Sequence, residues 1–199
     1  MLWSATEAQS IDKSSIQDYG IPSLSLMEEA GTAVFRQSLR LWRPHTEIII
    51  LAGPGNNGGD ALVAARLLFE AGFAPRVYDI RDPDSRESPE RLLQREKLAS
   101  LGLSLLPLGP GSKLSHSPGK ALLILDGLLG IGFKGSLRPG AIQDALRAAA
   151  SLKAERVLAI DLPSGLDADR WEQERALLAA TDTITFGALK ALHAVDPSR

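Results

Sequence analysis

The feature that most constrains the fold of this chain is a series of short apolar segments separated by helical ones. Residues 47–52 (EIIILA) form a continuous, largely β-branched run, which is typical of a strand buried on both faces. Similar runs lie at residues 120–126 (KALLILD) and 156–161 (RVLAID), with shorter ones at 75–80, 103–106 and 182–186. Capping signals and helical spacing of apolar residues predict helices near residues 4–19, 23–43, 60–71, 90–101 and 140–152.

This alternation predicts an α/β protein. Strands that are buried on both faces need helices on both sides, so the pattern favours a Rossmann-like three-layer αβα sandwich with a mainly parallel central sheet. The 199 residues fit one domain with a sizeable core, and neither a linker nor a repeat divides them. We therefore predict a single domain over residues 1–199.

Composition excludes several classes of function. The chain has no cysteine, which excludes disulfides, thiolate nucleophiles and Cys-ligated zinc, and its three histidines show no metal-ligand spacing. The net charge of −2 gives no indication of nucleic-acid binding. No apolar run approaches the roughly 18 residues of a membrane span. The N-terminal segment lacks the basic start and apolar block of a signal peptide, so we expect a cytoplasmic protein.

Polar, glycine-rich segments follow three of the predicted strands. They are residues 53–60 (GPGNNGGD), 126–135 (DGLLGIGFKG) and 161–167 (DLPSGLD). Because ligands bind beyond the carboxyl ends of the strands in such sheets, the three segments are predicted to open onto one crevice.

The first segment matches a dinucleotide-binding fingerprint. Gly53, Gly55 and Gly58 have the G-x-G-x-x-G spacing between a strand and a helix, where backbone N–H groups and the helix N-terminus can bind phosphate. Asp79 lies about 20 residues further on, where a ribose-binding acid would lie. On these residues alone, an NAD-dependent oxidoreductase and a tight turn without function are about equally good interpretations.

The same segment carries polar residues that a dinucleotide fingerprint does not need. Asn56, Asn57 and Asp60 add amide oxygens and a carboxylate, which are ligands that hard cations prefer. Taken singly, the two asparagines are better explained as turn-forming residues and Asp60 as a helix-capping acid.

Two further acids end apolar strands. Asp126 and Asp161 each follow a buried run, and a turn after Asp161 directs the Ser164 hydroxyl back toward the same site. Each alone is explained by turn formation or capping, and Lys134 by a solvated charge. Two acids at two strand ends that face one crevice are less easily explained in that way.

Together these segments resemble the YjeF N-terminal domain family, the NAD(P)H-hydrate epimerases. The match also includes residues 19–22 (YGIP), 26–31 (LMEEAG) and a weaker block at 183–190 (TITFGALK), all in the family's order. Two residues depart from the family pattern, since Glu29 stands where asparagine is common and Ala61 where glycine is common. The likeness fades after Lys190, where family members usually continue and are often fused to a dehydratase domain.

The resemblance implies an isomerase for nicotinamide nucleotide repair. Its substrate would be NADH or NADPH hydrated at C6 of the nicotinamide ring (NADHX and NADPHX). It would interconvert the R and S epimers, so that a partner, NAD(P)H-hydrate dehydratase, can use the S form. Inversion needs the C–O bond, or the ring, to open and close reversibly. A carboxylate can transfer the proton and stabilise a transient iminium, and we expect Asp161 to do so.

The resemblance also implies binding residues. Substrate contacts are expected from Asn56, Asn57, Gly58, Gly59, Asp60, Gly130, Ile131, Gly132, Phe133, Lys134, Gly135, Ser136 and Asp161. A potassium ion is expected as the cofactor, held by oxygen atoms of Asn57, Asp126 and Ser164.

Two other functions are compatible with parts of the sequence. One is an NAD-dependent oxidoreductase, although no dedicated hydride-transfer acid stands out. The other is a non-catalytic nucleotide-binding module of the same fold, since a fold does not determine a function. The N-terminal helices are candidates for a homodimer interface, although apolar stripes on helices more often pack on their own core.

Overall fold

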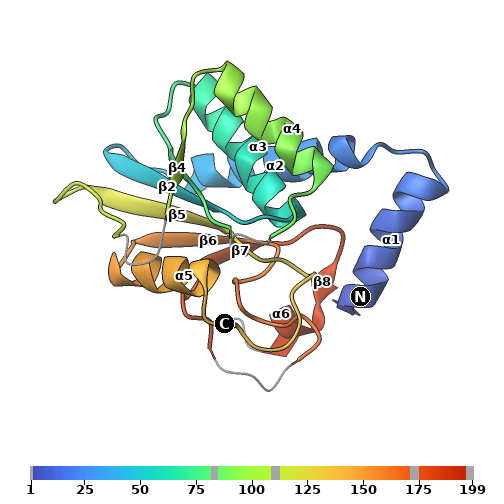
Figure 1. Cartoon of the computed structure of the whole chain (residues 1–199). Coiled ribbons are helices and arrows are strands. Elements are labelled where there is room, and N and C mark those ends of the chain that lie inside the picture. The colour runs from blue at the N-terminus through green and yellow to red at the C-terminus, as the bar shows by residue number, and fades with distance from the viewer. Residues whose placement is uncertain (1, 82–84, 109–112, 171–174, 196–199) are drawn as a thin grey trace.

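The computed structural model describes residues 2–81, 85–108, 113–170 and 175–195 of the chain (Figure 1). The helices are α1 (Ala5–Gln17), α2 (Ser23–Leu41), α3 (Asn56–Glu70), α4 (Pro89–Ser100), α5 (Ala141–Ser151) and α6 (Ala191–Val195). The strands are β1 (Leu2–Trp3), β2 (Thr46–Ala52), β3 (Arg76–Asp79), β4 (Leu105–Pro107), β5 (Ala121–Gly127), β6 (Arg156–Ile160), β7 (Asp182–Ile184) and β8 (Leu189–Lys190). In this part of the chain no helix combines the length and apolar character needed to cross a bilayer.

Six strands form one parallel sheet, in the order β4-β3-β2-β5-β6-β7. The central pair is the most extensive, since β2 and β5 are in register from Thr46 and Ala121 to Ala52 and Gly127. Each of the other neighbouring pairs is also parallel. The predicted α/β class and parallel sheet are therefore confirmed.

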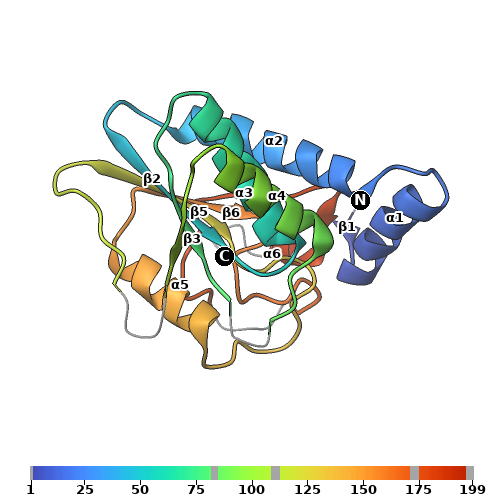
Figure 2. The same cartoon turned by 45° about the horizontal axis from the view of Figure 1, so that its top comes forward.

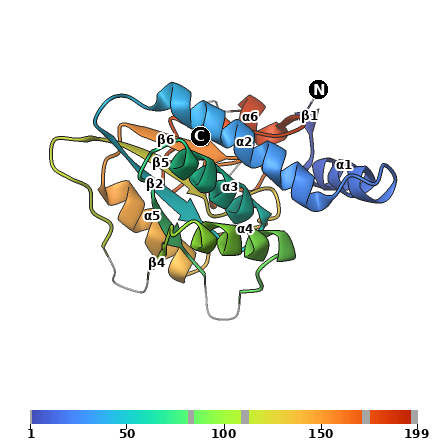
Figure 3. The same cartoon turned by 90° about the horizontal axis from the view of Figure 1, so that it is seen from above.

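Helices cover both faces of this sheet, as the apolar strands require. Figure 1 shows α2, α3 and α4 above the sheet and α5 below it, and the view from above in Figure 3 shows the first three lying together over one face. The arrangement is the predicted three-layer sandwich. Since β3 and β4 lie on one side of β2 and β5 on the other, the chain reverses direction across the sheet between β2 and β5.

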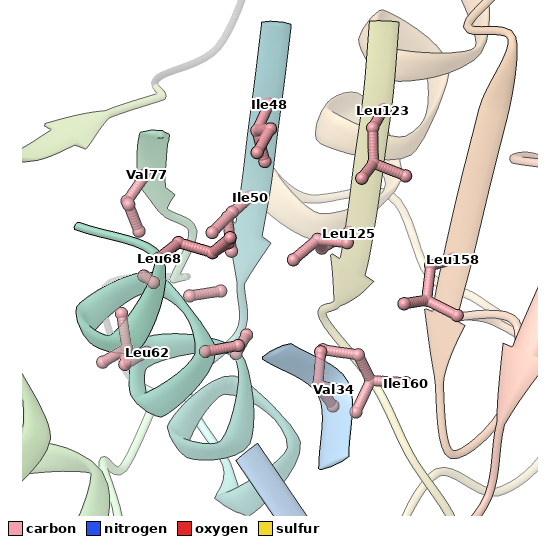
Figure 4. Packing of buried hydrophobic residues seen from close by; sticks show 14 of the residues in the cluster. Val34, Ile48, Ile50, Leu62, Leu68, Val77, Leu123, Leu125, Leu158 and Ile160 are labelled. Carbon is pink, nitrogen blue, oxygen red and sulfur yellow. The ribbon is translucent and has the colours of Figure 1, made fainter. Parts of the chain in front are cut away.

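The strand residues alternate between two hydrophobic cores because successive side chains of a strand point to opposite faces. Ile48 and Ile50 pack with Leu62 and Leu68 of α3 and with Val34 of α2 (Figure 4). The intervening strand residues, Ile49 and Leu51, pack with Ala145, Leu146 and Ala149 of α5 on the other face. A strand that is buried on both faces has to be apolar throughout, which explains the unbroken run that marks it in the sequence.

Several element boundaries differ from those predicted. Helix α3 begins at Asn56 rather than near Asp60, because Gly55 is the extended N-cap residue and the backbone N–H of Gly59 already donates to the Gly55 carbonyl at 3.1 Å. Asp60 is therefore not the capping acid. Strand β6 ends at Ile160, one residue before Asp161, and β7 ends at Ile184 rather than near residue 186. Predictions for residues 109–112 and 196–199 lie outside the described residues.

Both ends of the described chain meet in a small second sheet that the sequence did not predict. Strand β1 pairs in parallel with β8, with Trp3 opposite Lys190. Helix α1 follows with the predicted capping box, in which the Ser4 hydroxyl accepts from the backbone N–H of Glu7 at 3.1 Å. Figure 2 shows α1 beyond the end of α2, beside β1. The N-terminal segment therefore lies at the same end of the molecule as β8 and α6.

Close contact between α2 and α3 depends on Gly31. A Cβ atom at this position would lie 2.3 Å from the Val63 Cβ, so the two helices would have to separate. We expect Gly31→Ala to lower the free energy of unfolding by about 2 kcal/mol, because overpacking costs about 1–3 kcal/mol and alanine regains at most about 1 kcal/mol in helix propensity. Urea denaturation measures the change. Arg36→Ala, on the exposed side of α2, is the matched control, and equal stability of the two variants would contradict the packing argument.

Candidate functional site

A pocket of about 610 Å³ lies beyond the carboxyl ends of β2, β5 and β6, next to the position where the chain reverses across the sheet. Parallel α/β sheets bind their ligands at this position. The walls come from the loops after these strands, from α1 and from the segment around β8. A smaller hollow of about 230 Å³ at the opposite ends of the strands is lined by Arg43, Glu155 and Arg156 and carries none of the predicted site residues.

Glycines hold the first two loops in direct backbone contact. A Cβ atom on Gly53 would lie 2.0 Å from the Leu128 carbonyl oxygen, and one on Gly58 would lie 1.9 Å from the Gly53 carbonyl oxygen. The backbone N–H of Gly53 donates to the Gly127 carbonyl at 3.1 Å. The loop after β2 therefore packs directly on the loop after β5, which leaves the first turn of α3 facing the pocket.

The second loop brings the third strand end into the same site. A Cβ atom on Gly130 would lie 3.2 Å from both the Asn57 Cγ and the Asp161 Oδ2. Because Gly130 has no side chain, the two polar groups approach the same point of the loop from α3 and from the end of β6.

Asp161 is the most constrained carboxylate of the site. Its φ of +67° is in the left-handed region that a non-glycine residue rarely adopts, and such strain is concentrated at functional sites. Its Oδ2 accepts from the backbone N–H of Ile131 at 3.0 Å, and its Oδ1 accepts from the Thr185 hydroxyl at 3.1 Å. The backbone N–H of Asp161 donates to the Ile184 carbonyl at 2.7 Å. These contacts determine where the carboxylate points.

Lys190 is the charged partner of this carboxylate. Its Nζ donates to Asp161 Oδ1 at 2.7 Å, to the Thr185 hydroxyl at 2.6 Å and to the Phe186 carbonyl at 3.0 Å. An ammonium group has three N–H donors, so this set matches its full capacity. Lys190 is only 1% exposed, and an ion pair so far removed from water needs such complete hydrogen bonding.

His193 of α6 contributes to the same arrangement. Its Nδ1 accepts from the backbone N–H of Lys190 at 3.1 Å, and its Nε2 lies 3.2 Å from the Asp161 carbonyl oxygen. The two contacts together require a neutral ring that carries its proton on Nε2. Burial, followed by the charge of Lys190, lowers the pKa of His193, which agrees with a neutral ring.

Two more carboxyl groups line the pocket. Asp60 projects from α3 and is 9% exposed, and burial raises its pKa well above the usual range, with further contributions from Asp161 and Asp12. Asp12 projects from α1 and is more exposed to solvent. Loss of hydration raises the pKa of Asp12, whereas the nearby charge of Lys190 lowers it. The site therefore combines three acids with one buried ion pair.

A second polar cluster lies beside the pocket and contains Asn57, Asp126 and Ser164. Asp126 is fully buried, and its carboxylate accepts from the Ser164 hydroxyl at 2.6 Å and from the Ser164 backbone N–H at 2.9 Å. The Leu129 carbonyl oxygen accepts from Asn57 Nδ2 at 3.0 Å and lies 3.2 Å from the Ser164 hydroxyl. Asn57 and Ser164 therefore meet at one carbonyl group, and Ser164 links Asp126 to them.

Burial raises the pKa of the Asp126 carboxyl, although the bonds from Ser164 and Leu128 oppose the shift. Among the described residues no basic side chain forms an ion pair with Asp126, and no group of three or more His, Asp or Glu side chains could hold a metal. A carboxylate, an amide and a hydroxyl remain as oxygen donors. A set of oxygen donors with one carboxylate and two neutral groups suits a weakly bound hard cation better than a transition metal.

The predicted substrate residues divide into two groups. Those that line the pocket are Asn56, Asn57, Asp60, Gly130, Ile131, Gly132, Phe133, Lys134 and Asp161. Gly58, Gly59, Gly135 and Ser136 do not line it. Gly58 and Gly59 pack instead against Gly53 and Met27, so they allow the close approach of backbones rather than presenting a surface to a ligand.

Lys134, for which the sequence suggested a solvated charge, is about half exposed and also forms ion pairs. Its Nζ donates to Asp169 at 2.5 Å and lies 3.7 Å from Asp167. The hydrogen bond to Asp169 raises the pKa of Lys134. Asp169 also accepts from the backbone N–H of Ala5 at 2.7 Å, so this pair links the loop after β5 to the start of α1.

Asp79 does not occupy the position of a ribose-binding acid. It forms an ion pair with the buried Arg91, whose Nε donates to the Gly53 carbonyl at 2.5 Å, and a second one with Arg81 at 3.3 Å. Asp79 is also absent from the pocket lining. The acid that supported the oxidoreductase alternative is therefore engaged in ion pairs outside the pocket, which removes the structural support for that alternative.

Sequence reasoning missed Lys190, Asp12 and Trp3 as site residues. Lys190 ended the weakest block of the resemblance, and that position was its only signal. Asp12 and Trp3 belong to the N-terminal segment, where a polar helix position and an isolated tryptophan carry no chemical pattern. All three reach the pocket because β1 pairs with β8.

The strand order and the pocket at the reversal point define a Rossmann-like α/β protein with an acidic ligand site. Comparison with known proteins identifies the family. The chain belongs to the family described as YjeF-related protein N-terminus, whose model matches residues 23–192. The recognition made from the sequence is thus confirmed.

Individual relatives agree with this assignment. The chain is 35% identical over 183 residues to an NAD(P)H-hydrate epimerase of Limosilactobacillus reuteri, which covers 92% of this chain and 82% of the relative. It is 38% identical over 167 residues to the bifunctional NAD(P)H-hydrate repair enzyme Nnr of Hyperthermus butylicus, which covers 84% of this chain. The chain spans about a third of the length of such bifunctional relatives, 31% in this case.

A solved structure has the same fold. The crystal structure of the yeast protein ynu0 superposes with a TM-score of 0.80 and 24% sequence identity, and the alignment covers 98% of this chain and 83% of the yeast chain. This likeness supports the three-layer α/β architecture.

The ion pair between Lys190 and Asp161 leads to a stability prediction. We expect Lys190→Met to lower the free energy of unfolding by about 3–5 kcal/mol, because it leaves a buried carboxylate without its charge partner. Chemical denaturation measures the loss, and adding Asp161→Asn to the same chain is expected to recover part of it.

Lys134→Met is the matched control. Lys134 also forms an ion pair, but its side chain is 49% exposed, so its loss is expected to cost less than about 1 kcal/mol. Similar losses in the two lysine variants would show that burial does not govern the Lys190–Asp161 pair.

Proposed function

We propose that this chain is an NAD(P)H-hydrate epimerase, an isomerase that interconverts the R and S forms of NADHX and NADPHX. The observation that carries the proposal is Asp161, which has a strained backbone conformation, whose carboxylate accepts from Lys190, and which lines a pocket formed in part by glycine-rich loops. Membership of the family and the printed names of its relatives support the same activity.

The pocket suits a nucleotide substrate. The first turn of α3 directs its N–H groups and its positive dipole end toward the pocket, an arrangement that favours phosphate. The loop formed by residues 130–134 provides the opposite wall. In this arrangement the phosphates lie near Asn56 and Asn57, and the hydrated ring lies near Asp161.

The chemistry needs a base and a group that stabilises positive charge. When the C6 hydroxyl leaves, the lone pair of the ring nitrogen forms an iminium, and a nearby carboxylate lowers the free energy of this cation. Water then adds to the other face of C6 and loses a proton. Asp161 can do both, because its carboxylate is paired with the Lys190 ammonium and is held in place by three donors, the Ile131 N–H, the Thr185 hydroxyl and Lys190 Nζ.

Asp161→Asn tests this assignment. The variant is expected to lose epimerase activity by at least about 100-fold, the usual contribution of a general acid–base group, and to keep its affinity for NADPH. Purified protein is mixed with R-NADPHX, appearance of the S form is followed by chromatography, and nucleotide binding is measured by calorimetry. An active Asp161→Asn variant would refute the role of Asp161. A wild-type chain that binds nucleotide without accelerating epimerisation would instead indicate a non-catalytic module.

We also propose that Asn57, Asp126 and Ser164 hold a potassium ion. The residues fit such an ion, because they supply three kinds of oxygen donor and include a buried carboxylate with no basic partner among the described residues. When bound, the ion would neutralise Asp126 and hold the loops after β2, β5 and β6 together. The proton-transfer residues of the pocket would act without direct contact with it.

The ion site is tested by stability. Thermal unfolding is compared in potassium chloride and in tetramethylammonium chloride at equal ionic strength. Potassium is expected to stabilise the wild type by about 1.4 kcal/mol when its concentration is ten times Kd. Ser164→Ala, which removes one ligand, is expected to reduce this difference, whereas the exposed Ser151→Ala is expected to preserve it. Equal unfolding of the wild type in both salts would remove the ion site from the proposal.

Further expectations remain predictions. The proposed reaction makes an NAD(P)H-hydrate dehydratase the functional partner, because that enzyme would consume the S form. A single domain over residues 1–199, a cytoplasmic location and a homodimer are likewise proposed. Exposed Ile11 and Ile16 on α1 support a homodimer face at the N-terminal helices.

A further inference from the structure

Epimerisation at C6 needs a proton donor, because a hydroxyl leaves far more readily as water than as hydroxide. Three carboxyl groups line the pocket, those of Asp12, Asp60 and Asp161. Their surroundings differ strongly, so the structure offers a basis for deciding which of them carries the proton.

The groups around Asp161 are hydrogen-bond donors, which suits a proton acceptor. Its carboxylate already receives the Lys190 ammonium, the Thr185 hydroxyl and the Ile131 N–H. A proton on Asp161 Oδ1 would displace the Lys190 ammonium and leave that buried charge without its partner. Asp161 is therefore suited to be a base at the start of the reaction, and the proton has to come from another group.

Asp60 has the opposite surroundings. It is 9% exposed and lines the pocket, yet no hydrogen bond or ion pair from the described residues reaches its carboxyl group. The charged groups that face it are Asp161, at the end of β6, and Asp12, on α1, and both are acidic. Burial and these two acids raise the pKa of Asp60, so its carboxyl group stays protonated to a higher pH than an ordinary aspartic acid.

Asp12 is less suited to the role. It lies on α1 at the solvent-exposed side of the pocket, where bulk water competes for any proton that it holds. Lys190 also opposes the rise in the pKa of Asp12. A pair of carboxyl groups whose surroundings favour opposite protonation states is the pattern of an acid and a base in one site, and Asp60 and Asp161 form that pair.

We propose that Asp60 is the proton donor of the epimerisation and that Asp161 is the base that receives the proton from the incoming water. This inference rests on the proposed function. Asp60 projects from α3 and Asp161 from the end of β6, so the two carboxyl groups reach the substrate from different walls of the pocket.

The atoms of the reaction balance as follows. The Asp60 proton passes to the C6 hydroxyl oxygen, the C6–O bond breaks with both electrons on oxygen, and water leaves. The ring nitrogen lone pair forms the iminium. A second water adds to the other face of C6 and gives its proton to Asp161 Oδ2, the oxygen that Lys190 does not contact. One water has been exchanged and one proton has moved from Asp60 to Asp161, and it returns through pocket water before the next turnover.

The experiment compares Asp60→Asn with the wild type in kcat, KM and stability. The amide keeps the shape of the side chain without a transferable proton, so kcat is expected to fall about 100-fold or more with little change in KM. Asp60→Glu keeps the proton and is expected to recover part of kcat, with a pH profile displaced from that of the wild type. Asp144→Asn, on the exposed first turn of α5, is the control for the same substitution away from the pocket.

Stability separates this role from a structural one. Since the folded-state pKa of Asp60 is raised, the wild type loses stability as pH rises from the unfolded-state value of about 3.9 through the folded-state pKa. Asp60→Asn has no such loss, so it is expected to unfold at the same or a higher temperature than the wild type, with an advantage that grows with pH across that window. A structural residue would instead lower the unfolding temperature when it is replaced.

The outcomes are distinct. Reduced kcat with undiminished stability supports the proposal. Unchanged kcat in Asp60→Asn, or loss of kcat only together with loss of stability, overturns it. Loss of kcat in Asp12→Asn but not in Asp60→Asn gives the donor role to Asp12 and also overturns it. An inactive wild type would refute the proposed function itself. If the wild type and Asp60→Asn are both active, the proposed function stands and only the role of Asp60 is refuted.

Discussion

The parallel pairing of β2 with β5 is the constraint on which the rest of the structure depends. The two strands stay in register over seven residue pairs, and both are buried between layers of helices. Because they are parallel and end together, the loops that follow them have to leave the sheet at the same level. Glycines at residues 53 and 58 then allow these loops to touch through their backbones. The position of the pocket follows from this contact.

Charge within the pocket is organised by one buried ion pair. Lys190 uses its three donors on Asp161, Thr185 and Phe186, so Asp161 is the acid that it contacts directly. Asp60 is buried, and the charged groups near it are the acids Asp161 and Asp12. The same low-dielectric surroundings therefore favour a carboxylate at one position and a protonated acid at another. Two chemically identical side chains acquire different properties through their partners alone.

Most of the fold could be predicted from the sequence, because it depends on local patterns. Unbroken apolar runs indicate strands buried on both faces, and the capping box at Ser4 and Glu7 marks the start of α1. The site was predicted in part, since Asn57, Asp126 and Asp161 lie at or just after the ends of recognisable strands and do converge. The spacing of Asp79 in the sequence is compatible with a ligand contact, but in the fold Arg91 pairs with its carboxylate, and spacing alone could not predict that partner.

The sequence by itself determined the α/β class, the mainly parallel central sheet and the family, since periodicity and ordered motifs are properties of neighbouring residues. Only the tertiary structure decided what surrounds each carboxyl group. Lys190 and Asp161 are 29 residues apart in the sequence, and most strands of the sheet lie between Asp12 and these two residues. Proton affinity depends on burial and on charges nearby in space, and those are set by how β1, β8 and the strand-end loops pack together.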